Sequence, residues 1–236
     1  MQAIILAGGK GSRLRPLTFS LPKPLVPLGE RPILEILILQ LKAAGCTRIT
    51  LAVNHMAELI MAFCGDGSKF GLSIEYSKET EPLGTAAPLR LIKNLEDNFL
   101  VLNGDVLTNL SFSRFFDQHL KSGNEMTVCT YQKSIPIDLG VLDLDEAGKF
   151  RKYIEKPTYH FRVSTGIYAL SKEVLKFIPP TGKYDLPDLV TAIDSNKRKL
   201  GLFFDPAMTW LDIGRPDDYE QAVQTFEKSP GEFLRT

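Results

Sequence analysis

The residues best suited to phosphate chemistry lie close to the N-terminus, in the stretch LAGGKGSRL (residues 6–14). Glycines let backbone N–H groups approach an anion closely, and the guanidinium of Arg13 offers a planar fork of donors that matches a phosphate group. The stretch overlaps the end of the apolar run AIILA (residues 3–7), where a buried strand would end. We therefore predict a phosphate-holding loop, although a plain glycine-rich turn between strand and helix would show the same pattern.

Two common phosphate-binding motifs do not fit this loop. A Walker A loop needs Lys followed by Ser or Thr after its last glycine, whereas Lys10 precedes Gly11. A dinucleotide fingerprint needs a third glycine where Leu14 stands, and the next apolar run ends at Asn54 rather than at an acid. These mismatches argue against a P-loop NTPase and against a Rossmann dehydrogenase.

Three further charged residues stand either between prolines or at the end of an apolar run. Lys23 stands between Pro22 and Pro24, which restrict the backbone and favour a fixed position over a solvated loop lysine. Asp105 and Asp212 each follow an apolar run, and Mg²⁺ needs only one or two carboxylates besides phosphate oxygens and water. Taken singly, either aspartate could equally be a turn or helix-cap residue.

The elements that would position these residues alternate between strands and helices. Strand-like runs cover residues 3–7, 48–54, 72–77, 99–105 and 126–131, and helical patterns cover residues 32–45, 57–65, 86–95 and 112–123. This rhythm predicts an α/β fold, a Rossmann-like, mixed but mostly parallel sheet flanked by helices. Since ligands of such sheets bind at the carboxyl ends of strands, the glycine-rich loop and both aspartates should meet there.

The second half of the chain is richer in strand patterns. We predict a hairpin over residues 140–157 turning at 146–148, strands over 161–170, 200–205 and 208–214, and a final helix over 216–228. No linker interrupts the pattern, so we expect a single domain over residues 1–236.

The amino-acid composition limits which binding partners and which cellular compartment we expect for this protein. Basic and acidic residues number 28 each, so there is no excess positive charge for nucleic acid or anionic membranes. Three scattered cysteines without a CxxC pair predict reduced thiols, and hence a cytoplasmic protein. No apolar run approaches a membrane span, and the N-terminal run is too short for a signal peptide. We expect neither a nucleic-acid nor a membrane partner, and leave a homo-oligomer open.

The stretch GGKGSRLRPLTFSLPKP (residues 8–24) resembles the signature of the sugar-1-phosphate nucleotidyltransferases. That pattern is Gly-Gly-x-Gly-(Ser/Thr)-Arg-Leu, then Pro-Leu-Thr, then Pro-Lys-Pro. Further similarities follow in order: EPLGTA (81–86), NGD (103–105), EKP (155–157), STGIY (164–168) and WLDIGRPDDY (210–219). The resemblance covers nearly the whole chain, is closest to short mannose-1-phosphate or heptose-1-phosphate guanylyltransferases, and implies a fold of the nucleotide-diphospho-sugar transferase type.

The resemblance implies a reaction and a set of residues. A sugar phosphate oxygen attacks the α-phosphorus of a nucleoside triphosphate and pyrophosphate leaves, so catalysis is positioning plus charge neutralisation. It implies catalytic roles for Arg13, Lys23 and Asp105, with Mg²⁺ held by Asp105 and Asp212. The implied nucleotide contacts are Leu6, Ala7, Gly8, Gly9, Gly11, Ser12, Arg13, Glu79, Pro82, Gly84 and Thr85. The implied sugar-phosphate contacts are Lys23, Gly140, Glu155, Lys156, Thr165 and Gly166. By the same resemblance, residues 1–131 would mainly bind the nucleotide, and residues 132–236 would mainly bind the sugar phosphate and supply the second metal aspartate.

Glu79 stands where the resemblance expects a residue that contacts the base. A carboxylate accepts hydrogen bonds, and guanine offers adjacent N1–H and N2–H₂ donors, so Glu79 favours GTP, unless it is a surface glutamate. Two alternatives stay open: the same reaction with UTP, dTTP or CTP and a glucose-type sugar 1-phosphate, and a non-catalytic nucleotide- or sugar-sensing module. The presence of all four charged residues of the implied catalytic and metal sites favours an enzyme over a sensing module; they are Arg13, Lys23, Asp105 and Asp212.

Overall fold

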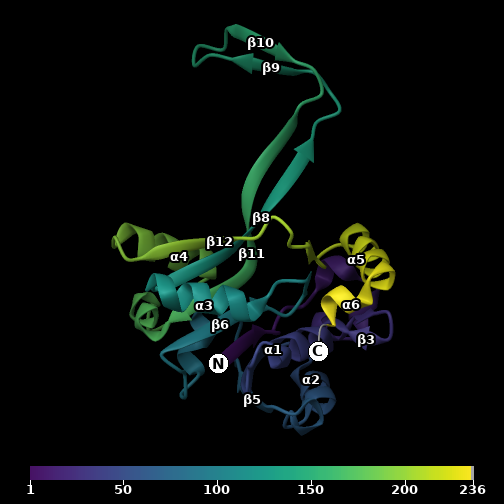
Figure 1. Cartoon of the computed structure of the whole chain (residues 1–236), viewed down its shortest axis with the longest axis vertical. Helices are drawn as coiled ribbons and strands as arrows, with labels where there is room; N and C mark the ends of the chain where they lie inside the picture. Colours follow the sequence, from purple (N-terminus) through teal and green to yellow (C-terminus); the bar gives the residue numbers. More distant parts are fainter. Residues whose placement is uncertain (235–236) are drawn as a thin grey trace.

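The structure is a computed structural model that describes residues 1–234. Its body is built on a seven-stranded sheet with the order β12-β8-β11-β6-β1-β4-β5 (Figure 1). Every strand of this sheet except β11 runs in the same direction. The strands are β1 Gln2–Leu6, β4 Arg48–Val53, β5 Ser73–Lys78, β6 Asn98–Asn103, β8 Met126–Pro136, β11 Thr158–Ser171 and β12 Leu200–Phe204. The predicted mixed, mostly parallel sheet is confirmed.

Helices cover both faces of this sheet. Along β1, Ala3 and Ile5 belong to a core cluster with α1, α2, α3 and α5, whereas Ile4 belongs to a second cluster with α4. The α-helices are α1 Ile33–Ala43, α2 Ala57–Cys64, α3 Phe112–Ser122, α4 Leu186–Ser195, α5 Pro216–Lys228 and α6 Pro230–Phe233. Short 3₁₀ helices span Ser12–Leu14, Leu17–Phe19, Lys23–Leu25, Ser68–Phe70, Ala87–Leu91 and Lys172–Phe177. Among the described residues, no helix has the length and apolar character required to cross a bilayer.

Two local predictions differ from the structure. The helix expected over residues 86–95 is wrong, because only a 3₁₀ helix forms at Ala87–Leu91 and the chain is extended at Ile92. The backbone N–H groups of Ala86 and Ala87 donate to the carbonyl of Tyr184, so a tertiary contact fixes this segment. Helix α4 was not predicted, although Asp185 caps it and Pro187 stands in its first turn.

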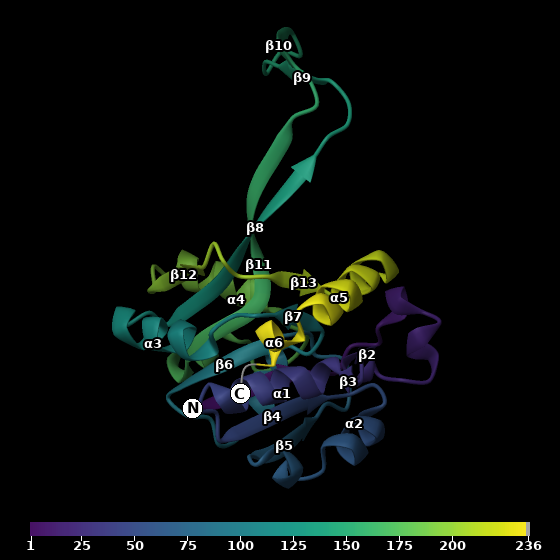
Figure 2. The same ribbon diagram turned by 45° about the vertical axis from the view of Figure 1, so that its right-hand side comes forward.

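Strands β8 and β11 extend beyond the sheet as a two-stranded arm. Their register continues outward from the Ser164–Thr130 pair to the Thr158–Pro136 pair. The arm ends in the predicted hairpin, here formed by β9 Val141–Leu144 and β10 Phe150–Ile154. Both ribbon views show the hairpin projecting away from the body (Figures 1 and 2).

Two small ribbons complete the fold around the carboxyl ends of the parallel strands. Strand β13 Trp210–Asp212 pairs antiparallel with β7 Val106–Thr108, and β2 Pro27–Leu28 pairs with β3 Arg31–Pro32. The Asp212–Val106 pair of the first ribbon brings the segment around Asp212 beside the end of β6.

Candidate active site

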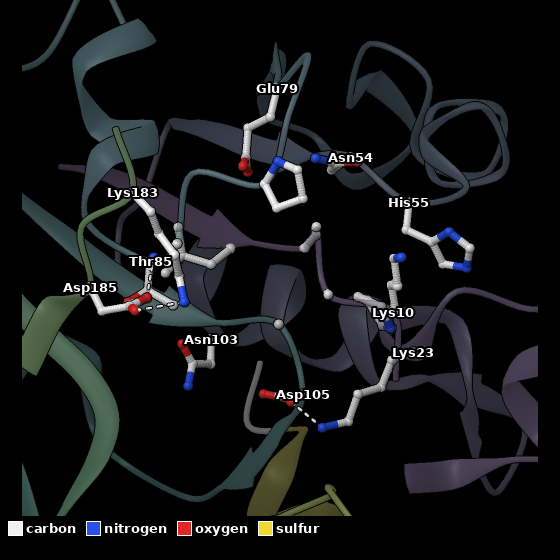
Figure 3. A pocket seen from close by; sticks show the side chains of 18 residues that line it. Lys10, Lys23, Asn54, His55, Glu79, Thr85, Asn103, Asp105, Lys183 and Asp185 are labelled. Atoms are coloured by element: carbon white, nitrogen blue, oxygen red, sulfur yellow. Dashed lines mark hydrogen bonds and ion pairs between the residues drawn. The ribbon is translucent and has the colours of Figure 1, made fainter. Parts of the chain in front are cut away.

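A cavity opens at the carboxyl ends of β1, β4 and β6 (Figure 3). Ten of its lining residues were predicted from the sequence, namely Leu6, Ala7, Gly8, Gly9, Lys23, Glu79, Pro82, Gly84, Thr85 and Asp105. The others were not predicted, and they are Lys10, Pro24, Asn54, His55, Asn103, Gly104, Lys183 and Asp185. The strand ends thus bring together the loop after β1, the segment after β6 and the loop around Gly84.

The glycine-rich loop lies tightly against its surroundings. A Cβ atom on Gly8 would lie 3.1 Å from Cβ of Asn54 and 3.2 Å from Oε1 of Glu79. Gly11 has a φ of +60°, and its carbonyl accepts a hydrogen bond of 2.8 Å from the hydroxyl of Thr18. Such contacts leave room for a backbone but not for larger side chains. The loop is therefore shaped by its glycines rather than being a loose turn.

Lys23 and Asp105 form an ion pair beside this loop (Figure 3). Lys23 is 7% exposed and begins a short 3₁₀ helix between its two prolines, so it is not a solvated loop lysine. Asp105 follows β6 after Gly104, whose backbone N–H donates to the carbonyl of Leu6 at 3.0 Å. The end of β6 is thereby held against the end of β1, and both charged groups face the cavity.

Asp212 and Arg13 adjoin the Lys23–Asp105 pair. The backbone N–H of Ile213 donates to the carbonyl of Asp105 at 3.0 Å. Burial raises the pKa of the Asp212 carboxyl, and the negative charge of Asp105 raises it further, whereas Lys23 and Arg13 act in the opposite direction. Arg13, Lys23 and Asp105 therefore all lie within electrostatic reach of Asp212.

The pair Asp105 and Asp212 fits a magnesium ion by its chemistry. Two neighbouring carboxylates repel one another, and a divalent cation bound between them would relieve that repulsion. Within residues 1–234, no group of three or more potential metal-ligating His, Cys, Asp or Glu side chains gathers. Such a small set suits Mg²⁺, which keeps waters and phosphate oxygens among its ligands.

Glu79 is buried at the far side of the cavity (Figure 3). Its Oε2 atom accepts a hydrogen bond of 3.0 Å from the backbone N–H of Leu83. Burial raises the pKa of this carboxyl, against the opposing effect of hydrogen bonds from Leu83 and Asn54. Glu79 is thus held in place as a buried acceptor, which the alternative of a surface glutamate does not fit.

The predicted sugar-phosphate residues divide into two groups. Thr165 and Gly166 lie at the base of the arm, and a Cβ on Gly166 would collide with Nδ2 of Asn103, a cavity residue. Gly140, Glu155 and Lys156 lie next to or within the hairpin that ends the arm. Within one chain the structure does not bring these three to the cavity, because the continuous β8–β11 ladder holds them away from it.

The cavity residues absent from the prediction had weak signals in the sequence. Asn54 and His55 directly follow β4, and Asn103 ends β6, so the rule about strand ends could have found them. Asp185 precedes the helical pattern LPDLVTAI, where an N-cap residue is expected, but nothing local links it to Thr85, 100 residues earlier.

A glycine-rich loop and paired charges at the carboxyl ends of parallel strands are typical of nucleotide-binding α/β proteins. The chain belongs to the nucleotidyl transferase family, whose family model matches residues 2–229. It is 38% identical over 239 residues to "Probable mannose-1-phosphate guanylyltransferase 1" of Oryza sativa subsp. japonica, covering 96% of this chain and 64% of the rice protein. It is 35% identical over 250 residues to "UTP--glucose-1-phosphate uridylyltransferase" of Synechocystis sp., covering 95% of this chain and 63% of that protein.

Solved structures show the same fold. HddC from Yersinia pseudotuberculosis matches with a TM-score of 0.71 and 26% identity, covering 95% of this chain and 99% of that one. A putative glucose-1-phosphate thymidylyltransferase from Bacillus anthracis, in complex with a sucrose, matches with a TM-score of 0.75 and 25% identity, covering 95% and 94% of the two chains. This chain spans slightly less than two thirds of the length of the rice and cyanobacterial proteins. It covers nearly the whole length of the Yersinia and Bacillus proteins.

Proposed function

We propose that this chain transfers a nucleotidyl group from a nucleoside triphosphate to a sugar 1-phosphate, giving an NDP-sugar and pyrophosphate. The observation that carries the proposal is the gathering of Arg13, Lys23, Asp105 and Asp212 beside a glycine-rich loop at one set of strand ends. The family match over residues 2–229 supports it. We favour GTP and a mannose- or heptose-type sugar 1-phosphate, because the rice relative is named a guanylyltransferase and Glu79 is a buried acceptor.

The reaction needs charge neutralisation more than covalent chemistry. Backbone N–H groups of the glycine-rich loop would hold the triphosphate, and Arg13 would stabilise the leaving pyrophosphate. Lys23 would contact the α-phosphate and the incoming phosphate, so that the attacking oxygen lies in line with the phosphorus. Asp105 and Asp212 would hold Mg²⁺, which supplies Lewis-acid neutralisation of phosphate charge when bound.

Glu79 and Gly84 would contact the nucleotide base and determine which base binds. A buried carboxylate can accept from both N1–H and N2–H₂ of guanine, whereas uracil offers only N3–H. We place the reaction in the cytoplasm, where the three buried, unpaired thiols of Cys46, Cys64 and Cys129 would stay reduced.

One alternative substrate pair has a specific observation in its favour. The Synechocystis relative is named for UTP and glucose 1-phosphate, so UTP with a glucose-type sugar is the second candidate. A non-catalytic sensing module is disfavoured, because such a module has no need for the charged groups that neutralise a transferring phosphoryl group.

The deciding experiment measures pyrophosphate release across a grid of GTP, UTP, dTTP, CTP and ATP against several sugar 1-phosphates, with Mg²⁺ and with EDTA. We expect turnover with GTP and a mannose- or heptose-type 1-phosphate, and loss of turnover in EDTA. Turnover that is highest with UTP and glucose 1-phosphate would establish the alternative. Nucleotide binding without turnover for every combination of nucleotide and sugar 1-phosphate tested would contradict the proposal that the chain is an enzyme.

A further inference from the structure

The outer part of the arm has no strand beside it. Beyond the Thr130–Ser164 pair, where β12 still pairs with β8 at Thr130, β8 and β11 pair only with each other in the described chain, as far as Pro136 and Thr158. A two-stranded ribbon is marginally stable in water unless one face packs against something. We define the arm as residues 132–162, with the β9–β10 hairpin and its flanks, residues 140–156, as its tip.

One face of the arm is exposed and mainly apolar, with Lys133 opposite Phe161 as its charged member. Side chains of directly paired residues share a face, so Ile135 and Tyr159 lie together, followed by Phe161 two residues further along β11. These three side chains are 43%, 36% and 51% exposed. The opposite face carries the polar pairs Ser134–His160 and Gln132–Arg162. This division predicts that the apolar face is buried against another surface.

The tip repeats this pattern. Leu142 pairs with Tyr153 and Leu144 pairs with Phe150, so all four side chains share one face of the hairpin. They are between 49% and 58% exposed. Contiguous exposed apolar side chains of this kind mark interaction surfaces in natural proteins.

The tip also carries an ordered polar group that the cavity does not use. The hydroxyl of Tyr153 donates to Oε2 of Glu155 at 2.9 Å, and the Tyr153 ring occupies the space that a side chain on Gly140 would need. Lys156 has a φ of +41°, in the left-handed region that non-glycine residues rarely adopt. A carboxylate accepts hydrogen bonds from sugar hydroxyls, and an ammonium group neutralises a phosphate.

These tip residues cannot reach the cavity of their own chain while the ladder is intact. Six residue steps separate Thr158 from Ser164 along β11, which is about 20 Å of strand at ~3.3 Å per residue. Lys156 is only two residues from Thr158, a stretch that spans at most about 7 Å. Rotation at the tip therefore leaves Glu155 and Lys156 far from the strand ends.

The cavity lacks the residues that the tip holds. Its lining comes from residues 6–105 and 183–185, and in the described chain nothing from 106–182 contributes to it. Gly166 packs against Asn103 at one edge, which places the base of the arm beside the nucleotide cavity. The cavity is thus lined by residues of the strand ends and of the 183–185 segment, and by no residue of the tip.

We propose that two copies of this chain exchange arms, so that the tip of each supplies Gly140, Glu155 and Lys156 to the sugar-phosphate side of the other's cleft. A two-fold symmetric dimer would complete both sites at once, because each chain contributes one tip to its partner and receives one tip in its own cleft. It also buries the apolar faces of arm and tip. The inference rests on the proposed function for its choice of ligand, but the exchange itself rests on the arm.

A second copy fits better than an unrelated partner. The polar group at the tip and a cleft that no tip residue lines are complementary features of one sequence, so two identical chains are sufficient to complete two sites. An unrelated protein that covered the arm would leave Glu155 and Lys156 without a ligand, and would leave the cleft without tip residues.

Complementation between two inactive variants tests the exchange directly. Asp105→Asn disables the cleft, and the double variant Glu155→Ala/Lys156→Ala disables the tip. Co-expression with two affinity tags allows the mixed dimer to be purified. In an exchanged dimer one of two sites combines an intact cleft with an intact tip, so about half of wild-type turnover per dimer should return. If arms act within their own chain, the mixed dimer stays as inactive as its parents.

A cross-link gives a readout that does not depend on turnover. A photo-reactive p-benzoylphenylalanine at position 156 should join two chains, and the joined peptide should include residues 103–105. Leu144→Asp should abolish the cross-link and give a monomer in light scattering, whereas Leu59→Asp on α2, at a similarly exposed leucine, should leave the dimer intact.

The outcomes separate the two proposals. A monomeric wild-type chain, a cross-link within one chain or a cross-link to no chain would overturn the exchange, as would a dimer with turnover but no complementation. A cross-link between chains in a protein that turns over no substrate of the grid would support the exchange and contradict the proposed function.

Discussion

Asp185 accepts two hydrogen bonds from Thr85 on one oxygen, Oδ1: 2.9 Å from the backbone N–H and 3.1 Å from the hydroxyl. The Thr85 hydroxyl in turn accepts a hydrogen bond of 2.8 Å from the backbone N–H of Leu186, the first residue of α4. Gly84 lies so close that a Cβ atom there would be 2.7 Å from the same Oδ1. The start of α4 therefore fixes the loop that carries Gly84 and Thr85 into the cavity.

We expect Asp185→Ala to weaken nucleotide binding about tenfold, because losing the acceptor of two hydrogen bonds costs on the order of 1–2 kcal/mol. The effect should fall on KM for the nucleotide more than on kcat, since Asp185 is a positioning residue. Asp185→Asn keeps Oδ1 and should bind nearly normally. Steady-state kinetics and equilibrium dialysis check this. Equal KM values for the wild type and Asp185→Ala would show that the loop does not depend on Asp185.

The neighbouring carboxylates Asp105 and Asp212 should be needed for turnover but not for folding. We expect Asp105→Asn and Asp212→Asn each to lower kcat by a factor of about 100 or more, a loss typical of removing a charge-stabilising group. Asp212→Asn should also unfold at an equal or higher denaturant concentration, because burial and Asp105 disfavour the charged form of Asp212. Pyrophosphate release and urea unfolding measure the two effects. Retained turnover in either variant would remove that residue from the proposed magnesium site.

Glu79 should control the choice of base. Glu79→Gln replaces one acceptor oxygen by a donor amide, so the ratio of kcat/KM for GTP to that for UTP should fall about tenfold. Glu81→Gln is the matched control, because Glu81 is exposed two residues away and should leave the ratio unchanged. An unchanged ratio in both variants would mean that another group reads the base.

The sequence was most informative where local pattern and tertiary structure agree. The final helix spans residues 216–228 as predicted, because Pro216 suits a first turn and Ala222 and Phe226 supply one buried face. The strand end carrying Asp105 could be placed at the glycine-rich loop, because parallel topology puts carboxyl ends at one edge of a sheet. Alternation of apolar runs was enough for that inference. Asp212 reaches the same place by another route, through the antiparallel pairing of β13 with β7, which the sequence pattern did not indicate.

Contacts between distant segments limited the prediction elsewhere. Residues 86–95 contain an apolar pattern suited to a helix, but the carbonyl of Tyr184 accepts from the backbone of Ala86 and Ala87, and only a 3₁₀ helix forms. Glu155 and Lys156 could be assigned to a sugar phosphate by resemblance, yet nothing in a local pattern reports that β8 and β11 run on past the sheet. The length of a paired ladder depends on both strands at once.

His119 offers a test of the core that is independent of function. It is fully buried, and a neutral ring with its proton on Nε2 satisfies both neighbours: Nε2–H donates to Oδ1 of Asn98 at 3.2 Å, and Nδ1 accepts from the hydroxyl of Thr127 at 2.8 Å. Burial lowers the pKa of this imidazole to about 4. His119 therefore takes up a proton near pH 4 in the folded protein, whereas in the unfolded chain it takes one up near about pH 6.5.

This difference predicts a loss of stability in mild acid. Above about pH 6.5 both states hold His119 neutral, and as pH falls toward about 4 only the unfolded state gains the proton, so the free energy of unfolding falls by up to ~1.4 kcal/mol per pH unit. Between about pH 7 and pH 5 the contribution of His119 is about 2 kcal/mol. His119→Gln, neutral at every pH, should lack this part of the slope. Urea unfolding of both proteins at the two pH values isolates it, because every other titrating group is shared. Parallel slopes for the two proteins would show that His119 is protonated as easily in the folded state as in the unfolded one.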